Sequence, residues 1–204
     1  MSKQKVKTTP NFADTSPAHQ AAIAAGKDHF RSWQYNVADH FKDSSVEEIR
    51  QNLRETAHPF AVCFEHVIGD FNMATGVRNA NGFNAKEVFY IGDRKWDRRA
   101  AVGVHNYTEV QWIPTIEDFM KLKEKYVIVG IDNVPGSVPL SSYHWPENAL
   151  MVFGEEGPGL TPAMQAFCKD IVHIEMFGSV RSFNCGSASA VAMYDFVSKY
   201  RARQ

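Results

Sequence analysis

The chain has 204 residues, with 22 lysines and arginines against 23 aspartates and glutamates, so its formal net charge is -1. This length fits one domain, or one domain with an appended arm, and an apolar content of 44% is typical of a globular protein. The charge excludes a histone-like or polybasic nucleic-acid binder, but it leaves room for a local basic patch.

The three cysteines, Cys63, Cys168 and Cys185, form no C-x-x-C pair, which excludes a zinc ribbon. Their odd number argues against a disulfide framework, so we expect reduced thiols in a cytoplasmic protein. No apolar run reaches the roughly 18–20 residues of a membrane-spanning helix, and the polar N-terminus lacks the apolar segment of a signal peptide. We expect no membrane association, no metal, and a flexible tail over residues 1–15.

The first elements expected along the chain are helices. Ser16 before Pro17 is typical of a helix start. Ser45 and Glu48 have the spacing of a capping box. Apolar side chains at helical spacing lie between them, at Phe30, Trp33, Val37 and Phe41. We therefore expect a helical N-terminal extension over residues 16–57, which packs against the domain or forms a dimer arm; the alternative is a substrate-recognition extension.

From residue 58 onward, short apolar runs alternate with helix-compatible segments. The expected strands are residues 60–64, 88–91, 110–113, 126–131, 149–153 and 171–174, and the expected helices are residues 115–125, 162–169 and 187–200. Strands that alternate with helices predict an α/β domain over residues 58–204, with a mainly parallel sheet covered on both faces. Binding residues are then expected in loops at strand ends, such as residues 131–147.

Two segments that follow expected strands have compositions that suggest a binding site. In the first, residues 71–80, a helix beginning near Asn72 would place this residue at the cap and Arg78 almost two turns later. The second, residues 151–160, runs from a buried strand into three glycines, a proline and two acids. Glycine lets a backbone approach a ligand closely, and adjacent carboxylates at a strand end are costly unless paired or used. This loop favours a neutral or cationic ligand over a phosphate, the alternative being a plain strand-to-helix turn.

A third segment, residues 174–190, combines a strand end, a polar loop and a helix start made of small residues. The small residues predict close packing of that helix against a neighbouring backbone. Ser182 and Asn184 are suited to satisfy exposed backbone groups at the helix start. Cys185 has no histidine or acid at a fixed spacing, so we interpret it as a small buried thiol rather than a nucleophile.

Taken in order, the three segments resemble the motifs of the SpoU/TrmH family of SPOUT RNA methyltransferases, over roughly the last three-quarters of the chain. The family motifs are an Asn followed six residues later by an Arg, then G-x-E-x-x-G-L, then S-L-N-V-S-x-A. The matching residues are Asn72 and Arg78; Gly154, Glu156, Gly159 and Leu160; and Ser182, Asn184 and Ala188. Departures from the motifs are Ala74 for Gly, Phe183 for Leu, and Cys185-Gly186 for Val-Ser.

The resemblance implies a parallel α/β sheet with a C-terminal deep trefoil knot, a feature that sequence physics alone would not propose. It implies a homodimer that binds S-adenosylmethionine in the knot and methylates a ribose 2′-hydroxyl of tRNA or rRNA. The implied cofactor contacts are Ile131, Gly154, Gly159, Ile174, Met176, Ser182 and Phe183. The implied catalytic residues are Asn72, Arg78, Glu156 and Asn184.

Arginine is effectively always protonated, so we interpret Arg78 as a clamp on an RNA phosphate and a stabiliser of oxyanion charge rather than as a base. A phosphate or a water would accept the proton. Asn72 is expected to position Arg78 or the ribose. Glu156 is expected to orient its loop or to hold Arg78.

A cation-rich stretch at residues 93–99 is expected to hold RNA through phosphate contacts and base stacking on Trp96. The expected RNA contacts are Arg94, Lys95, Arg98, Arg99 and, beside the third motif, Arg181. Two aspartates dilute the stretch, so a solvated surface turn is the alternative. For the whole protein, the alternatives are a non-catalytic RNA-binding module and base methylation. A Rossmann oxidoreductase is disfavoured because no G-x-G-x-x-G follows the first strand.

Overall fold

The computed structural model describes residues 37–66, 71–93 and 95–204. The chain divides into two units, Met1–Asp43 and Ser44–Gln204. In the first unit the structure describes a short 3-10 turn, η3 (Asp39–Phe41). The helix predicted to run through Phe30 and Phe41 is therefore not α-helical at its end. The rest of that predicted helix, and the predicted helix start at Ser16, lie outside the described residues. No described helix has both the length and the apolar composition needed to cross a membrane.

The second unit begins with α2 (Val46–Glu55), whose first turn confirms the predicted capping box. The backbone amide of Ser45 donates to Glu48 Oε2 at 2.7 Å, and Ser45 Oγ accepts from the amide of Glu48 at 3.3 Å. Ile49 is buried, and Arg50 Nε donates to the carbonyl of Asn106 at 2.9 Å. The burial of Ile49 and the hydrogen bond of Arg50 hold α2 against the α/β domain.

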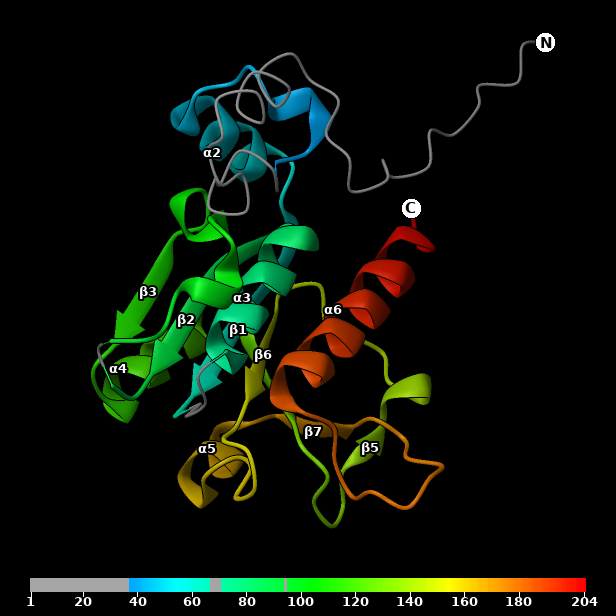
Figure 1. The fold of residues 1–204 in the computed structure, drawn as a ribbon. Helices are drawn as coiled ribbons and strands as arrows, with labels where there is room; N and C mark the ends of the chain where they lie inside the picture. The colour runs from blue at the N-terminus through cyan, green and yellow to red at the C-terminus, as the bar shows by residue number, and fades with distance from the viewer. Residues whose placement is uncertain (1–36, 67–70, 94) are drawn as a thin grey trace, which may run out of the picture. The chain divides into compact units, whose positions relative to one another are not determined.

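Seven strands form one sheet in the order β3-β2-β1-β6-β4-β7-β5 (Figure 1). Every pairing is parallel, which confirms the parallel sheet of the predicted α/β fold. The strands are β1 (His58–Glu65), β2 (Ala85–Ile91), β3 (Val110–Ile113), β4 (Val127–Ile131), β5 (Val138–Pro139), β6 (Ala149–Phe153) and β7 (Asp170–His173). The sequence analysis missed β5, which has only two residues and lies in the segment expected to be a loop.

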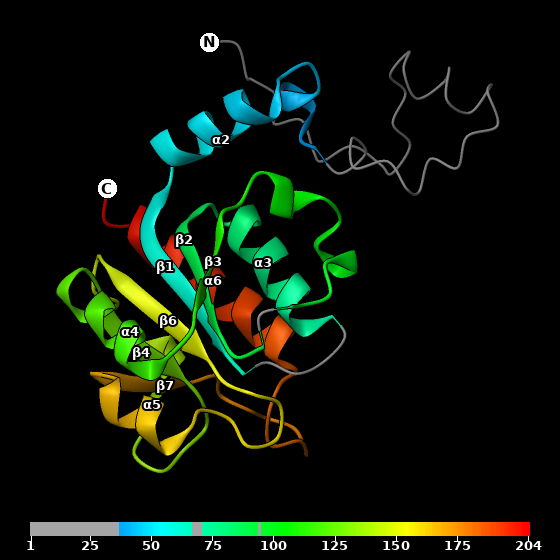
Figure 2. The same ribbon diagram turned by 90° about the vertical axis from the view of Figure 1, so that its left-hand side faces the viewer.

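Helices cover both faces of this sheet (Figure 2). On one face lie α3 (Asn72–Gly82) and α6 (Cys185–Arg201), and on the other lie α4 (Ile116–Met120) and α5 (Pro162–Phe167). Side chains alternate along β1 accordingly: Phe60, Val62 and Phe64 join the core beneath α3 and α6, whereas Ala61 and Cys63 join the core beneath α4 and α5. Single 3-10 turns complete the connections, at η4 (Arg99–Ala101), η5 (Val104–Asn106), η6 (Lys121–Glu124) and η7 (Leu140–Ser142).

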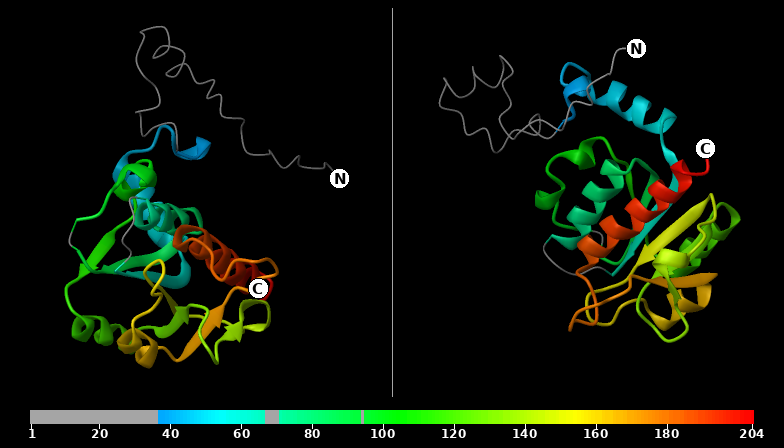
Figure 3. Two further views of the ribbon diagram at one scale, coloured as in Figure 1. Left: turned by 60° about the horizontal axis from the view of Figure 1, so that its bottom comes forward. Right: turned by 90° about the vertical axis from the view of Figure 1, so that its right-hand side faces the viewer.

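The helices α3 and α6 lie side by side although about a hundred residues separate them in the chain (Figure 3). A Cβ on Gly186 would lie 2.9 Å from Thr75 Cγ2, so only glycine allows this approach without a shift. Asn79 Nδ2 donates to the carbonyl of Gly186 at 2.8 Å and to Ser189 Oγ at 3.0 Å. The predicted close packing of the small-residue helix start is confirmed, and it brings the first and third sequence motifs together.

Candidate functional site

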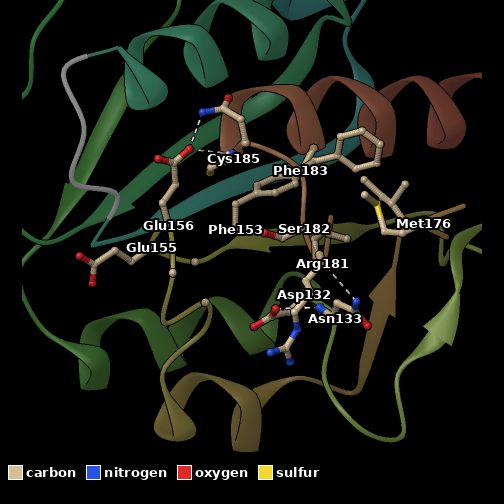
Figure 4. Close-up of a pocket in the computed structure, with 17 residues that line it drawn as sticks. Asp132, Asn133, Phe153, Glu155, Glu156, Met176, Arg181, Ser182, Phe183 and Cys185 are labelled. Atoms are coloured by element: carbon tan, nitrogen blue, oxygen red, sulfur yellow. Dashed lines mark hydrogen bonds between the residues drawn. The ribbon is translucent and has the colours of Figure 1, made fainter. Parts of the chain in front are cut away.

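A pocket of about 340 Å³ opens at the carboxyl ends of β4, β6 and β7 (Figure 4). Its volume lies in the range of about 300–1,000 Å³ that is usual for small-molecule sites. Three segments that begin at strand ends supply the lining: Ile131, Asp132 and Asn133 at the end of β4; Phe153, Gly154, Glu155, Glu156, Gly157 and Gly159 at the end of β6; and Ile174, Met176, Arg181, Ser182, Phe183 and Asn184 after β7, with Cys185 and Ala188 on α6.

The loop after β6 is a tight turn that requires glycine at two positions. Gly159 has a φ of +75°, and a Cβ there would lie 2.4 Å from Asp132 Oδ2. A Cβ on Gly154 would lie 2.2 Å from the carbonyl carbon of Gly159. Across the turn, Gly159 N donates to the carbonyl of Glu155 at 2.9 Å, and Glu155 N donates back to the carbonyl of Gly159 at 3.2 Å. Backbone atoms therefore form this wall of the pocket.

Two carboxylates from other strands hold the far end of the same loop. Asp132 Oδ2 accepts from the amide of Leu160 at 2.9 Å. Glu65, which is only 2% exposed, accepts from the amide of Thr161 at 3.0 Å and also from its hydroxyl. The sequence analysis missed both acids. The available signal was their place, because Glu65 is the last residue of buried β1 and Asp132 directly follows β4.

Glu156 connects the second motif to the third. One of its carboxylate oxygens accepts from Asn184 Nδ2 and from the amide of Cys185, the latter at 3.3 Å. Cys185 is the first residue of the 17-residue helix α6, and a negative charge at a helix N-terminus is stabilised by the helix dipole. The expectation that Glu156 orients its loop agrees with these contacts.

Asn184 connects the third motif to the first. It is the N-cap of α6, because its Oδ1 accepts from the amide of Ser187 at 3.2 Å. Its Nδ2 donates to Asn72 Oδ1 at 2.8 Å. The expectation that Asn72 caps α3 was wrong: Phe71 is the N-cap, Asn72 is the first helical residue, and its side-chain oxygen is used by Asn184. The structure thus joins Asn72, Asn184 and Glu156 in one hydrogen-bonded chain.

The remaining predicted residues divide between the pocket and the outer surface. All seven residues expected to contact a cofactor line the pocket, and so does Arg181. Arg78 is exposed on α3, about 9 Å along the helix axis from Asn72, and is not part of the lining. The sequence analysis expected Glu156 to orient its loop or to hold Arg78, and its contacts described above go to Asn184 and Cys185.

Three cations of the cation-rich segment, Lys95, Arg98 and Arg99, lie outside the pocket lining. Lys95 and Arg98 are exposed, Arg99 forms an ion pair with Asp97, and Arg94 is outside the described residues. Trp96 is partly buried against the core, its ring edge-on to His105 at 6.4 Å between centroids, and Arg98 lies 5.7 Å from its centroid. The ring of Trp96 therefore has two side-chain neighbours, His105 and Arg98.

Cys185 is a buried thiol, as its surroundings in the sequence suggested. Burial, together with the nearby carboxylate of Glu156, raises the pKa of Cys185 to about 12. The thiol stays protonated at neutral pH, whereas a cysteine nucleophile needs its thiolate form. The site contains no activated cysteine at this position.

A parallel α/β sheet with a small-molecule pocket at its strand ends defines a ligand-binding α/β domain. The model of the SpoU rRNA Methylase family matches residues 59–194, more than half of the chain. The chain belongs to this family.

Two curated proteins are similar to this chain at low identity. The 23S rRNA (guanosine-2'-O-)-methyltransferase RlmB of Neisseria meningitidis is 24% identical over 155 residues, 72% of this chain and 61% of that protein. The tRNA (guanosine(18)-2'-O)-methyltransferase of Saccharomyces cerevisiae is 28% identical over 99 residues, 44% of this chain and 7% of that protein. The chain thus spans about three-fifths of the length of the first relative and far less of the second.

Solved structures share the fold. The A. aeolicus TrmH/SpoU tRNA modifying enzyme has a TM-score of 0.69 at 16% identity, with 78% of this chain and 83% of that chain covered. The SpoU methyltransferase AviRb from Streptomyces viridochromogenes, in complex with AdoMet, has a TM-score of 0.64 at 21% identity, with 74% and 62% covered. At these identities the likeness concerns the fold.

Proposed function

We propose that this protein is an RNA methyltransferase that transfers a methyl group from S-adenosylmethionine to a ribose 2′-hydroxyl of tRNA or rRNA. The observation that carries the proposal is the hydrogen-bonded chain of Asn72, Asn184 and Glu156 at the pocket. It joins all three motifs of a family whose members include ribose methyltransferases of both RNA classes. When bound, S-adenosylmethionine supplies an electrophilic methyl group on its sulfonium.

The pocket suits this cofactor in shape and charge. Gly154 and Gly159 line the pocket without side chains, so an adenosine can approach their backbone closely. Asp132, Glu155 and Glu156 line the pocket, and their carboxylates complement the positive sulfonium and ammonium groups. The residues proposed to hold the cofactor are Ile131, Gly154, Gly159, Ile174, Met176, Ser182 and Phe183. The same acids would repel a phosphate-rich ligand, so the RNA backbone is held elsewhere.

The decisive experiment offers the protein tritium-labelled S-adenosylmethionine and total RNA, then hydrolyses the RNA with alkali. A 2′-O-methyl group blocks cleavage of the adjacent phosphodiester, so ribose methylation leaves the label in dinucleotides. Label in mononucleotides would indicate base methylation. RNA binding without incorporated label would indicate a non-catalytic module.

Arg78 is the proposed phosphate clamp and oxyanion stabiliser, and Asn72 is proposed to position the ribose. Arg78 is outside the pocket lining, so Arg78→Ala should leave cofactor affinity unchanged while it lowers the rate of methyl transfer by about 100-fold or more. Arg201→Ala, at the exposed end of α6, is the matched control and should keep full activity. Full activity in Arg78→Ala would refute the role.

We propose that Lys95 and Arg98, together with Arg94 and Arg99, contact RNA phosphates. The exposure of Lys95 and Arg98 supports this. Trp96, which contacts His105 and Arg98, is the residue proposed to stack on a base. Combined Lys95→Gln and Arg98→Gln substitutions should weaken RNA binding but leave cofactor binding intact, as measured by filter binding and calorimetry.

We propose that the protein is a homodimer that associates through exposed apolar side chains before and along α6. These side chains are Phe177, Val180 and Phe183 in the preceding loop, and Val191 and Tyr194 on the helix, with Phe177 96% exposed. Exposed apolar patches mark interaction sites on soluble proteins. Phe183 also lines the pocket, so the partner subunit would adjoin the cofactor.

Sedimentation equilibrium tests the association. The wild type should have twice the chain mass of 23.0 kDa, and Tyr194→Glu should lower the mass toward one chain. Trp112→Glu, at an exposed position on the edge strand β3, is the control and should stay dimeric. A monomeric wild type would contradict the proposal.

We also propose the trefoil knot that the family resemblance implies. Its support is the position of β7, which pairs with β4 on one side and with β5 on the other, although β4 and β5 follow each other directly in the chain. The segment after β7 stays close to the connection between them, because Asn133 Nδ2 donates to the carbonyl of Arg181 at 3.1 Å. An experimental structure that traces this crossing tests the proposal.

A further inference from the structure

The charges that line the pocket are unbalanced. Asp132, Glu155 and Glu156 contribute three carboxylates, and among the described lining residues Arg181 has the one positively charged side chain. Hydrogen bonds from the amides of Leu160 and Cys185 hold Asp132 and Glu156 in place. A ligand that carries both charges could therefore place its positive groups near Asp132 and Glu156 and its negative group near Arg181.

S-adenosylmethionine is such a ligand. Its sulfonium and ammonium groups are positive, and the carboxylate of its methionine end is negative. Near these acids this carboxylate would be repelled unless a cation accompanies it, whereas a guanidinium can pair with a carboxylate through two parallel hydrogen bonds. We propose that Arg181 binds the carboxylate of the cofactor's methionine end. The inference rests on the proposed function, because it requires this cofactor in the pocket.

The local structure of Arg181 suits this role. Its carbonyl accepts from Asn133 Nδ2 at 3.1 Å, which holds the main chain against the loop after β4. Its side chain is exposed and extends along the pocket side that carries Asp132 and Asn133 (Figure 4). The backbone is thus held by a neighbouring loop, and the guanidinium can meet a ligand group.

The sequence analysis expected Arg181 to contact RNA, and the two roles predict different results. A cofactor contact makes affinity depend on the ligand carboxylate. An RNA contact leaves cofactor affinity unchanged and alters RNA binding alone.

Calorimetry with two ligands separates the roles. S-adenosylmethionine and its decarboxylated form differ only in the carboxylate. The wild type should prefer S-adenosylmethionine by about tenfold, the lower end for a charge-assisted pair because the arginine is exposed. In Arg181→Gln that preference should vanish through a loss of affinity for S-adenosylmethionine alone, and Arg181→Lys should recover part of it. Arg201→Gln is the matched control and should behave as the wild type does.

Three results would overturn the proposal. An equal loss of affinity for both ligands in Arg181→Gln would indicate that the residue holds the loop. Unchanged affinity for both ligands with weaker RNA binding would indicate an RNA contact. A wild type that binds neither ligand would overturn the proposed function itself, and this result is distinguishable because it requires no variant.

Discussion

Glu65 offers a direct test of how the cofactor loop is held. Its carboxylate is buried, lies outside the pocket lining, and receives both the amide and the hydroxyl of Thr161. The hydroxyl of Thr161 also accepts from the amide of Met164 at 3.2 Å, so its proton points toward Glu65. In Glu65→Gln an amide of nearly the same shape presents one oxygen and one NH2 group to these two donors, and one donor loses its acceptor.

The expected cost follows from these contacts. A buried donor without an acceptor costs about 1–3 kcal/mol, and the remaining bond changes from charge-assisted to neutral. We expect Glu65→Gln to lower the free energy of unfolding by about 2 kcal/mol, a factor of about thirty in the unfolding equilibrium. Thr161 ends the loop that contains Gly159. We therefore expect about half of this change in free energy to weaken the affinity for S-adenosylmethionine, which makes the affinity roughly fivefold lower.

Urea unfolding measures the first effect and calorimetry the second. Asp170→Asn is the matched control, because Asp170 accepts the hydroxyl of Tyr143 at 2.9 Å and is not part of the pocket lining. It should lower stability by about 1 kcal/mol and leave cofactor affinity unchanged. The reasoning is refuted by an unchanged stability and affinity in Glu65→Gln, or by an equal loss of affinity in Asp170→Asn.

Three further outcomes follow from the structure. Asn184→Ala removes the cap of α6, so urea unfolding should show a loss of about 1–2 kcal/mol, with methyl transfer lowered as well. Burial favours a higher pKa for Glu87, but hydrogen bonds from Lys125 and Tyr126 outweigh it and hold the pKa below 4.5. This carboxylate therefore stabilises the fold above its unfolded-state pKa and loses that effect as the pH falls through its folded-state pKa, so Glu87→Gln should flatten the acid limb of the stability profile. Cys185 should react with iodoacetamide more than about a hundredfold faster in urea than in the native protein.

Local patterns were sufficient to predict most of the sheet and its helices. The capping box at Ser45 and the apolar runs of β1, β2, β3 and β6 are short-range signals, and each appears where its pattern indicated. The incorrect predictions also arose from short-range patterns. Spacing alone predicted an α-helix through Phe41, where a 3-10 turn lies, and the two residues of β5 are too few to form a pattern.

The connections within the site could not be predicted in this way. Asn184 meets Asn72 across 112 residues, and Thr161 meets Glu65 across 96. No periodicity encodes such contacts, because they depend on strand order and on how closely Gly186 lets α6 approach α3. Family motifs placed Asn72 and Asn184 in one site, whereas Glu65 and Asp132 belong to none of the motifs considered and became visible only in the structure.

The distribution of charge would keep the proposed cofactor and RNA sites apart. The pocket lining carries three carboxylates and one arginine, whereas Lys95, Arg98 and Arg99 lie outside it. A polyanion is expected to avoid the first surface and to use the second, so a net charge of -1 is compatible with the proposed binding of RNA. Binding of the two ligands should therefore respond differently to salt.

Salt titration makes this separation measurable. Arg94, Lys95, Arg98 and Arg99 are the four proposed phosphate contacts. Four contacts predict that the logarithm of RNA affinity falls with the logarithm of salt concentration with a slope of about -3 on single-stranded RNA. Arg98→Gln should reduce the magnitude of this slope by about 0.7. Cofactor affinity should change by less than about threefold between 50 and 200 mM salt, because charges within a pocket are screened less than exposed ones. A slope near zero for RNA, or an equally steep one for the cofactor, would contradict the separation.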